Sequence, residues 1–388
     1  MVRVLGVDPG TKSFDLAVVE DGRVVWEYSI ETGRVARDPR SLLDAIREAG
    51  RVDAIAGPSG YGVPVTESRD VVDPRRFAVE VLLLSREEDI EEGVRRGDPG
   101  IMVYKALAEA VVELCRDESR RTIFIPGVVH LPTVRPGAKY NRVDLGTADK
   151  LAVTALAVYQ LHRGDPARAD LMVLEMGYGY NALMVVESGR VTWGLGGTSL
   201  APGMLTAGPL DLEAVVMGGS WVRSDVFHGG VMEACGTLDP GEAAGRARSM
   251  GGECGEAYES MMEQIATVIA GIHARTGISR LVVSGRLTGL KSVIDDLASR
   301  LPGSIAVEVL QPLEGASRTK HAAHGYALVV EGLLGGSASG VVERMRIRDA
   351  CGTALDHALH PRLAEARRRL QEAYRASVRN PRLCGGPA

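Results

Sequence analysis

The stretch VLGVDPGTKSFDLAVVEDGRVV, residues 4–25, places Asp8, a proline and a glycine between two apolar runs. Each run is typical of a buried strand, and the acidic-glycine turn EDG predicts a hairpin to a third strand. A hairpin turn needs no buried carboxylate, so the acid at the strand end requires another explanation. A similar stretch, LMVLEMGYGYNALMVVESGRVTWG at 171–194, carries Glu175 at the same point. Two such stretches indicate a duplicated architecture.

Size, charge and cysteine usage narrow the class of protein. A chain of 388 residues predicts two or three domains, and its net charge of −5 gives no basic field for nucleic acid. No apolar run reaches the roughly 18 residues that span a membrane, and no signal-peptide pattern is present. The five cysteines are widely spaced without a CxxC pair, which predicts reduced thiols rather than a metal site. We therefore expect a cytoplasmic protein that binds neither nucleic acid nor membrane.

The hydrophobic periodicity predicts the same order of elements, βββαβαβα, in each half of the chain. In the first half the expected strands are 2–8, 14–20, 23–31, 52–57 and 122–128, with helices at 39–49, 101–117 and 147–163. In the second half they are 170–175, 180–187, 190–196, 280–285 and 305–310, with helices at 256–275, 289–300 and 317–334.

The repeat sets the expected domain boundaries. We predict a first domain over 1–165, a second over 166–335, and a linker at RGDPARAD, residues 163–170. Residues 336–388 are expected to form a helical extension, with helix to about residue 376 and a disordered tail in CGGPA at the end. A homodimer formed through these C-terminal helices is one expectation for the assembly.

Two βββαβαβα halves resemble the superfamily of acetate and sugar kinases, heat-shock 70 chaperones and actin. The resemblance covers most of residues 1–335 and implies an α/β fold of duplicated ribonuclease H-like, actin-like domains flanking a nucleotide cleft. Within it, the chain is most similar to the archaeal family of predicted butyrate kinases. The order of motifs also resembles type III pantothenate kinases. The resemblance implies ATP and Mg²⁺ as cofactors.

In this superfamily the first hairpin turn holds nucleotide phosphate and the strand-end acid faces the metal. The matching residues are Asp8, Gly10, Thr11, Lys12 and Ser13. Exposed N–H groups of a tight turn form a nest for anions, glycine admits phosphate to the main chain, and an acid can hold Mg²⁺ through waters. The alternative is an ordinary Asp-Pro-Gly turn.

The second phosphate loop of the superfamily matches EMGYGYNA, with Glu175, Gly177, Tyr178, Gly179 and Asn181. Many relatives have Asp where this chain has Glu175, which puts direct metal contact in doubt. Asn181 could supply a hydrogen-bond donor, whereas Tyr178 is larger than the usual small polar residue. The alternative is a strand-turn-strand whose acid faces solvent.

The adenosine motif resembles LVVSGRLTGLKSVIDDL, residues 281–297. Ser284 and Gly285 end a buried strand, Gly289 precedes a helix, and Arg286 could stack on the base or reach the ribose. Any α/β sheet produces strand-glycine-helix turns. This motif therefore supports nucleotide binding only because it follows the two phosphate loops in the order found in the superfamily.

DLGTADKLAVTALAVY, residues 144–159, resembles the acidic segment of pantothenate-type kinases. Asp149 is the leading candidate for a general base, and Lys150 could pair with phosphate. Capping of the helix by Thr147 or Asp149 is the rival interpretation. A carboxylate acceptor would need no base at all.

Two loops are candidates for the acceptor pocket. GLGGTSLAPG contains Gly196, Gly197 and Thr198, and GPSGYG contains Ser59 and Tyr61; each is equally consistent with a structural turn. The predicted activity is ATP-dependent phosphotransfer to a small molecule, such as the short-chain carboxylate butyrate. A kinase of an alcohol, pantothenate-like compound or sugar is the first alternative. An ATPase switch or actin-like regulator is the second.

Overall fold

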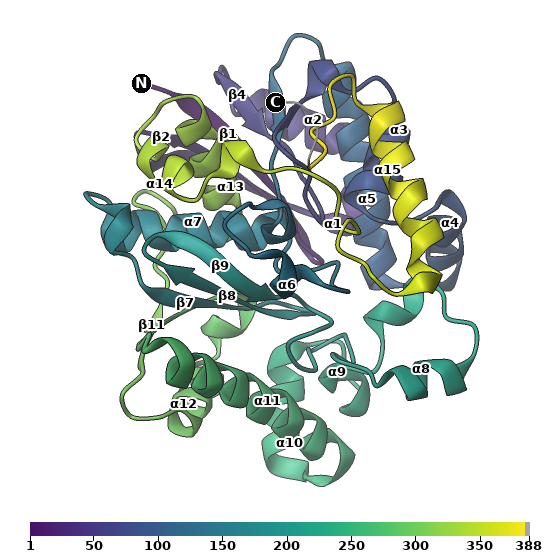
Figure 1. Cartoon of the computed structure of the whole chain (residues 1–388), viewed down its shortest axis with the longest axis vertical. Coiled ribbons are helices and arrows are strands. Elements are labelled where there is room, and N and C mark those ends of the chain that lie inside the picture. The colour runs from purple at the N-terminus through teal and green to yellow at the C-terminus, as the bar shows by residue number, and fades with distance from the viewer. Residues whose placement is uncertain (385–388) are drawn as a thin grey trace. The chain divides into compact units, whose positions relative to one another are not determined.

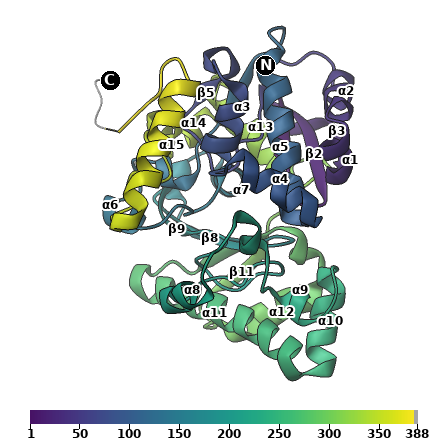
Figure 2. The same cartoon turned by 90° about the vertical axis from the view of Figure 1, so that its right-hand side faces the viewer.

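The computed structural model describes residues 1–384 and divides into two compact units. Unit 1 consists of Met1–Ala169, Glu187–Trp193 and the chain from Gln311 onward. Unit 2 consists of Asp170–Val186 and Gly194–Leu310. The elements of both units are labelled in Figure 1 and appear from a second side in Figure 2.

The sheet of unit 1 has six strands in the order β3-β2-β1-β4-β6-β5. The first three strands form an antiparallel meander, β4 and β6 continue it in parallel with β1, and the short β5 closes the edge. The strands are β1 (Arg3–Pro9), β2 (Ser13–Glu20), β3 (Arg23–Glu31), β4 (Ala54–Ala56), β5 (Thr66–Glu67) and β6 (Thr122–Phe124).

Two helices pack together on this sheet. Helix α13 (His321–Leu333) contacts β1, β2 and β4, and also packs against α7 (Ala148–His162). The approach is close enough that a Cβ at Gly6 would lie 2.0 Å from the carbonyl oxygen of Ala323. Glycine in the middle of β1 therefore lets α13 lie directly on the sheet.

The remaining helices of unit 1 lie between its strands in the sequence or, for the last three, after all of them. They are α1 (Thr32–Arg37), α2 (Arg40–Glu48), α3 (Pro74–Arg76), a π-helical segment (Phe77–Leu82), α4 (Glu87–Arg96), α5 (Pro99–Arg116), α6 (Pro136–Lys139), α14 (Ser339–Arg344) and α15 (Ala364–Ser377).

The second sheet runs β11-β10-β7-β8-β9, which repeats the order of the first five strands of unit 1. This duplication confirms the predicted α/β, actin-like fold class. Its strands are β7 (Leu171–Met176), β8 (Asn181–Glu187), β9 (Arg190–Leu195), β10 (Arg280–Ser284) and β11 (Ala306–Val309). Its helices are α8 (Leu212–Gly218), α9 (Val231–Ala234), α10 (Pro240–Met250), α11 (Gly252–Thr276) and α12 (Lys291–Arg300).

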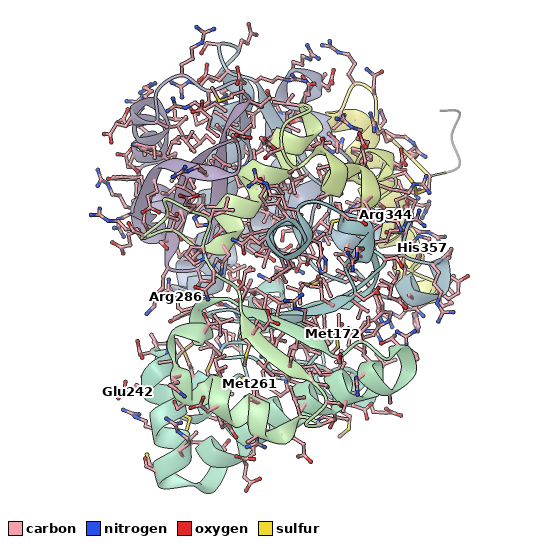
Figure 3. The ribbon with its side chains drawn as sticks, turned by 90° about the vertical axis from the view of Figure 1, so that its left-hand side faces the viewer. Met172, Glu242, Met261, Arg286, Arg344 and His357 are labelled. Carbon is pink, nitrogen blue, oxygen red and sulfur yellow. A yellow bond between two sulfur atoms is a disulfide. The ribbon has the colours of Figure 1, made fainter. Side chains whose placement is uncertain are left out.

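The core of unit 2 lies between its sheet and α11. Met172 on β7 and Met261 on α11, both labelled in Figure 3, are fully buried. Helix α11 alternates such buried residues with charged ones and is therefore amphipathic. Its apolar side faces the core of unit 2.

The units differ from the expected domains at the C-terminal end. Helix α13, expected in the second domain, belongs to unit 1, as do residues 336–388 as far as they are described. The reason is packing: α13 lies on β1 and β2, α15 packs on the π-helical segment, and Val378 bridges Val71. Leu370, Ala373 and Tyr374 of α15 are buried in this way within one chain.

The expected helical extension to about residue 376 is interrupted. Helix α14 ends at Arg344, and α15 begins only at Ala364. Gly352, with φ of +81°, and Pro361 lie in the interval, and neither residue favours a continuous helix. Of the expected disordered tail, Cys384 is ordered in a disulfide and the rest lies outside the described residues.

The prediction of five reduced thiols is likewise wrong. Cys235 bonds to Cys254 in unit 2, and Cys351 bonds to Cys384 in unit 1, which leaves Cys115 free. Burial raises the pKa of the Cys115 thiol to about 12. Within residues 1–384, no helix has the length and apolar character required to cross a membrane.

Candidate functional site

A pair of buried carboxylates lies at the first hairpin turn of unit 1. Asp8 ends β1 and Asp15 begins β2, and the two residues are direct partners across the antiparallel ladder. They are 4% and 2% exposed. Two acids buried side by side repel each other and cost desolvation energy unless a cation lies between them.

Lys320 supplies that cation. Its Nζ lies 2.7 Å from Oδ2 of Asp8 and 3.4 Å from Oδ2 of Asp15, and it donates to the carbonyl oxygen of Ser13 at 3.2 Å. The lysine side chain keeps 30% of its surface exposed, whereas the acids are buried. Lys320 immediately precedes α13, far along the chain from both acids.

Residues 317–320, which we call the anchor segment, are held by all three strands of the meander. Oε1 of Glu27 on β3 accepts from the amide and hydroxyl of Ser317, at 2.8 and 2.6 Å. Oε2 accepts from the amide and hydroxyl of Thr319, at 3.1 and 2.8 Å. The amide of Lys320 donates to Asp15 at 3.2 Å. One acid from each strand therefore fixes the segment that carries the lysine.

The electrostatics of the cluster follow from this geometry. Burial raises the pKa of Asp8 above its ordinary value, the nearby Asp149 and Asp15 raise it further, and Lys320 opposes them. Burial lowers the pKa of Lys320, but the attraction of Asp8 and Asp15 outweighs it and the net shift is upward. Hydrogen bonds from Ser317 and Thr319 overcome the opposing effect of burial and lower the pKa of Glu27 to about 2.

The turn after β1 is shaped around Lys320. A Cβ on Gly10 would lie 2.1 Å from the lysine Nζ, so glycine leaves room for the ammonium. Thr32 fixes the turn from outside, because its hydroxyl donates to Gly10 at 2.6 Å and its amide donates to Lys12 at 3.0 Å. Thr11 and Ser13 are half-buried on the turn and Lys12 is exposed.

Asp149 lies in the first turn of α7 and belongs to the same cluster, because its charge raises the pKa of Asp8. The Thr147 hydroxyl and the Lys150 ammonium both donate to its carboxylate. Burial raises the pKa of Asp149, but the charge and hydrogen bond of Lys150 and the bond from Thr147 lower it more. Thr147 occupies the N-cap position without making a side-chain capping bond, so simple capping does not explain this pair.

The GPSGYG loop contributes to the packing of the interior of unit 1. The Ser59 side chain is fully buried; its hydroxyl donates to Gly57 at 2.8 Å and accepts from the Ile125 amide at 3.0 Å. These bonds join the ends of β4 and β6, so the predicted substrate contact by Ser59 does not fit. Tyr61 is half-buried, and its hydroxyl accepts from Tyr104 at 3.4 Å.

In unit 2 the second turn and the adenosine-like turn lie side by side. Glu175 on β7 is the ladder partner of Ser284 on β10 and is 9% exposed. Gly285 has φ of +96°, and a Cβ there would lie 2.3 Å from the carbonyl oxygen of Met176 and 2.7 Å from Oε1 of Glu175. Glycine is therefore required at this position, whereas nothing lies within 4 Å of a Cβ on Gly289.

Tyr178 and Arg286 extend this end of unit 2. The Tyr178 hydroxyl donates to Leu238. Burial and the charge of Asp239 raise the pKa of Tyr178, while the positive charge of Arg286 lowers it, which places the three side chains near one another. Arg286, labelled in Figure 3, is exposed and accessible to a ligand.

The other residues expected to bind ligand in unit 2 pack against their own loops. Asn181 is 1% exposed and donates to Pro202 at 2.9 Å. A Cβ on Gly179 would lie 2.9 Å from Leu205, and one on Gly197 would lie 2.2 Å from the ring of Tyr180. Packing accounts for these residues. Others on the same loops are Gly177, whose amide donates to Tyr180 at 2.9 Å, buried Gly196, and half-buried Thr198.

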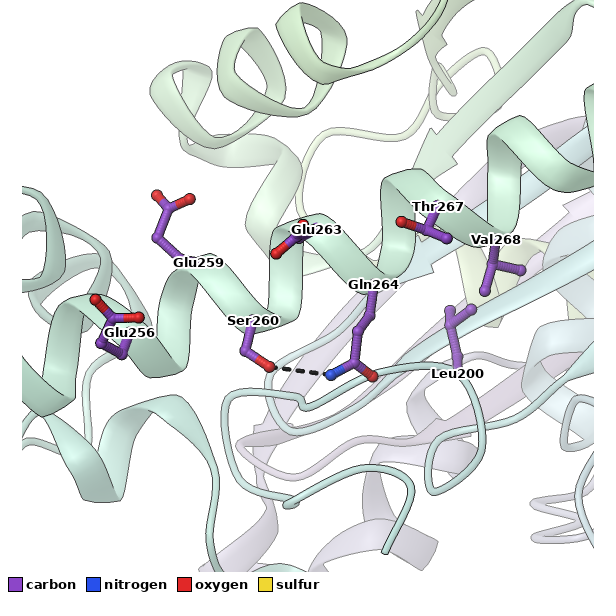
Figure 4. Close-up of a pocket in the computed structure, with 8 residues that line it drawn as sticks. All are labelled: Leu200, Glu256, Glu259, Ser260, Glu263, Gln264, Thr267 and Val268. Atoms are coloured by element: carbon purple, nitrogen blue, oxygen red, sulfur yellow. Dashed lines mark hydrogen bonds between the residues drawn. The ribbon is translucent and has the colours of Figure 1, made fainter.

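A surface pocket of about 380 Å³ lies in unit 2. Figure 4 shows that it follows α11, where Gln264 donates to Ser260 at 3.0 Å. Its lining residues are Leu200, Glu256, Glu259, Ser260, Glu263, Gln264, Thr267 and Val268. Leu200 belongs to the GLGGTSLAPG loop, and the other lining residues carry no predicted role. The predicted acids that form ion pairs lie instead in unit 1, so the candidate site is the polar cluster of Asp8, Asp15, Asp149, Lys150 and Lys320.

Solved structures with the same fold are kinases of short-chain carboxylates. A propionate kinase from Francisella tularensis has a TM-score of 0.56 at 11% identity, with 84% of this chain and 98% of that chain covered. The acetate kinase of Porphyromonas gingivalis has a TM-score of 0.55 at 14% identity, with 86% and 100% covered. That of Entamoeba histolytica has 0.51 at 13% identity, with 77% and 86% covered. At this identity the likeness establishes the fold.

Sequence comparison gives a family without a function. No curated protein sequence matches the chain. One family model matches residues 6–360, which include both sheets and every residue of the polar cluster. The chain therefore belongs to the family described as "Protein of unknown function (DUF1464)".

Proposed function

We propose that this protein is an ATP-dependent phosphotransferase that acts on a small molecule, with the polar cluster of unit 1 as its phosphate site. The observation that carries the proposal is Lys320, an ammonium held between Asp8 and Asp15 at the turn after β1. The duplicated fold, shared with the acetate and propionate kinases described above, supports the same activity.

The chemistry of phosphoryl transfer suits such a site. The protein positions an anion and stabilises charge on the transferred group, and it takes little covalent part. Lys320 and Lys150 would donate to phosphate oxygens, because an ammonium is a compact charge with three donors. Asp8, Asp15 and Asp149 would hold these ammoniums in place before the ligand arrives, which removes part of the ordering cost.

Mg²⁺ does not fit the residues expected to hold it. Asp8 is already in contact with Lys320, and Glu175 lies in unit 2 beside Gly285. Among residues 1–384, no group of three or more His, Cys, Asp or Glu side chains is arranged to hold a metal ion. We therefore assign no step of the reaction to a protein-bound metal.

Unit 2 would bind the nucleoside. Its two turns meet at Glu175 and Gly285, and the exposed Arg286 lies next to Tyr178. A guanidinium stacks on aromatic surfaces, and a nucleobase offers such a surface. We propose that Arg286 contacts the base or ribose and that Gly285 keeps this edge accessible.

The acceptor that the cluster favours is a carboxylate. An alcohol must lose its proton during attack, and an efficient general base has a pKa near the working pH. Asp149 has a lowered pKa because Lys150 and Thr147 hold its charged form. A carboxylate acceptor is already ionised at neutral pH, since such groups titrate near pH 4. Short-chain carboxylates such as acetate, propionate and butyrate are therefore the first substrates to test.

The test is ADP release from ATP supplied as its magnesium salt, measured with a panel of short-chain carboxylates, pantothenate and sugars. We expect acceptor-dependent ADP release with at least one carboxylate, and its loss in Lys320→Met. Lys291→Met is the control, because this lysine is exposed on α12 and pairs with Asp295 in unit 2. ADP release that no acceptor stimulates would indicate an ATPase switch instead, and no ADP release at all would refute the proposal.

A further inference from the structure

The position between Asp8 and Asp15 is a cation site by its chemistry. Two buried carboxylates, directly opposed across an antiparallel pair, present oxygens to one point at the hairpin turn. Carboxylate oxygens at such a turn are the ligands that divalent cations such as Mg²⁺ and Mn²⁺ prefer. In this chain, the cation that they contact is the ammonium group of Lys320.

Several independent contacts fix that ammonium. Glu27 binds the anchor segment through four hydrogen bonds, and the backbone amide of Lys320 donates to Asp15. The absence of a side chain on Gly10 leaves the space that the lysine Nζ fills, since a Cβ there would lie 2.1 Å away. The anchor segment, the two carboxylates and the space at Gly10 together fix the position of the lysine Nζ.

We propose that Lys320 is a tethered cation that occupies the Asp8–Asp15 position in place of a divalent metal ion, and that it keeps such ions out. Phosphate would then meet a fixed ammonium at this point rather than a metal held by the protein. The part of this inference that concerns phosphate rests on the proposed function. The part that concerns the metal does not.

The charges around Lys320 predict what its removal does to metal binding. With Lys320 in place, a divalent ion approaching Asp8 must displace or face an ammonium in contact with both acids, which is repulsive. With a neutral side chain of similar length, Asp8 and Asp15 would lose the ammonium that lies between them, and Asp149 would add to their negative field. Removal of one lysine should therefore create a metal site.

The experiment titrates Mn²⁺ into the full-length protein without nucleotide and follows free Mn²⁺ by electron paramagnetic resonance. Lys320→Met should bind one Mn²⁺ at least about tenfold more tightly than the wild type, because a cation has left the site. Lys12→Met is the matched control: the lysine is exposed on the same turn, and its loss changes the net charge equally. This control should bind Mn²⁺ like the wild type.

A second substitution locates the new site. Asp8→Asn combined with Lys320→Met should lose the gained affinity, because a ligand has been removed. Lys320→Arg should not gain affinity, because the cation is retained. Equal affinity in wild type and Lys320→Met, or an equal gain in Lys12→Met, would overturn the proposal.

Thermal unfolding covers the case in which Lys320→Met folds poorly. A ligand that binds only the folded state stabilises it in proportion to its affinity, so Mg²⁺ should raise the Tm of this variant and leave that of the wild type unchanged. If Lys320→Met does not fold even with Mg²⁺, the wild type decides. One Mn²⁺ bound to it at micromolar affinity and lost in Asp8→Asn overturns the inference; its absence upholds it.

The two claims fail separately. A wild type that excludes Mn²⁺ and a Lys320→Met variant that binds it would uphold the inference even if no acceptor were phosphorylated. Conversely, a wild type that binds Mn²⁺ at Asp8 and phosphorylates a carboxylate would retain the proposed function and refute the tethered cation.

Discussion

Glu27→Gln tests whether the anchor segment depends on charge. The Glu27 carboxylate accepts four hydrogen bonds, two on each oxygen. A glutamine keeps one acceptor oxygen and turns an amide donor toward the other pair, so it leaves at least one backbone amide without its partner. Hydrogen bonds to charged groups contribute about 1.5–3 kcal/mol each, and partial exposure reduces this value. We expect a loss of about 2 kcal/mol in the free energy of unfolding.

The stability that Glu27 contributes should depend on pH, and the direction follows from its lowered pKa. Glu27 has a folded pKa of about 2 against an ordinary value of 4.5. A lowered folded pKa contributes stability that is fully present above the unfolded pKa and is lost as the pH falls toward the folded value. The difference between wild type and Glu27→Gln should therefore be largest at pH 7 and shrink between pH 4.5 and about 2.

The assay is thermal unfolding followed by circular dichroism at pH 7 and at several acidic values. A loss of about 2 kcal/mol in a unit of this size lowers Tm by roughly 4–8 °C. Glu48→Gln is the control, because this glutamate is exposed at the end of α2. A Glu27→Gln protein that melts with the wild type at pH 7, or a difference that persists at pH 2, would refute the reasoning.

Three further predictions concern the remaining candidate residues. Gly285→Ala should destabilise the protein by at least about 1 kcal/mol and weaken nucleotide binding, because φ is +96° and the Cβ meets Met176; calorimetry would check both, and Gly289→Ala should do neither. With a carboxylate acceptor, Asp149→Asn should retain kcat within about tenfold across pH 6–9; a loss of 10²–10⁴ would instead identify a general base. Cys351→Ser should cost about 3 kcal/mol, because the disulfide closes a loop with a sequence separation of 33; an unchanged Tm under oxidising conditions would contradict this.

Local patterns in the sequence predicted the strands well. The meander is expected at 2–8, 14–20 and 23–31 and found at Arg3–Pro9, Ser13–Glu20 and Arg23–Glu31, because alternating apolar residues and a glycine turn determine it locally. The duplicated order follows from the same signals. Asp8 and Asp149 were named as separate candidates, and the resemblance was needed to choose them; that the charge of Asp149 raises the pKa of Asp8 emerged only from the structure.

The partner of Asp8 could not be predicted in this way. Lys320 is separated from Asp8 by 312 residues, and nothing near it in the sequence marks it as a ligand. Asp15 was also missed, since a single acid in an apolar strand is visible only once its ladder partner is known. Gly10 is predicted to admit phosphate to the main chain, and in the structure the Lys320 ammonium lies where its Cβ would be.

Tertiary packing explains the other differences. The start of α13 is set by the anchor segment rather than by a capping pattern, so the helix was predicted four residues too early, at 317 instead of His321. Ser59 looked like a loop hydroxyl, yet the approach of β6 buries it. Disulfide pairing likewise depends on which loops meet in space, which spacing alone does not reveal.

The most direct test of the central claim is a crystal structure of the wild-type protein with a non-hydrolysable ATP analogue. We predict that a phosphate oxygen lies within hydrogen-bond distance of the Lys320 Nζ, with the turn at 10–13 against the phosphates. Phosphates that contact neither Lys320 nor this turn, or a nucleotide seated only in the pocket along α11, would contradict the account.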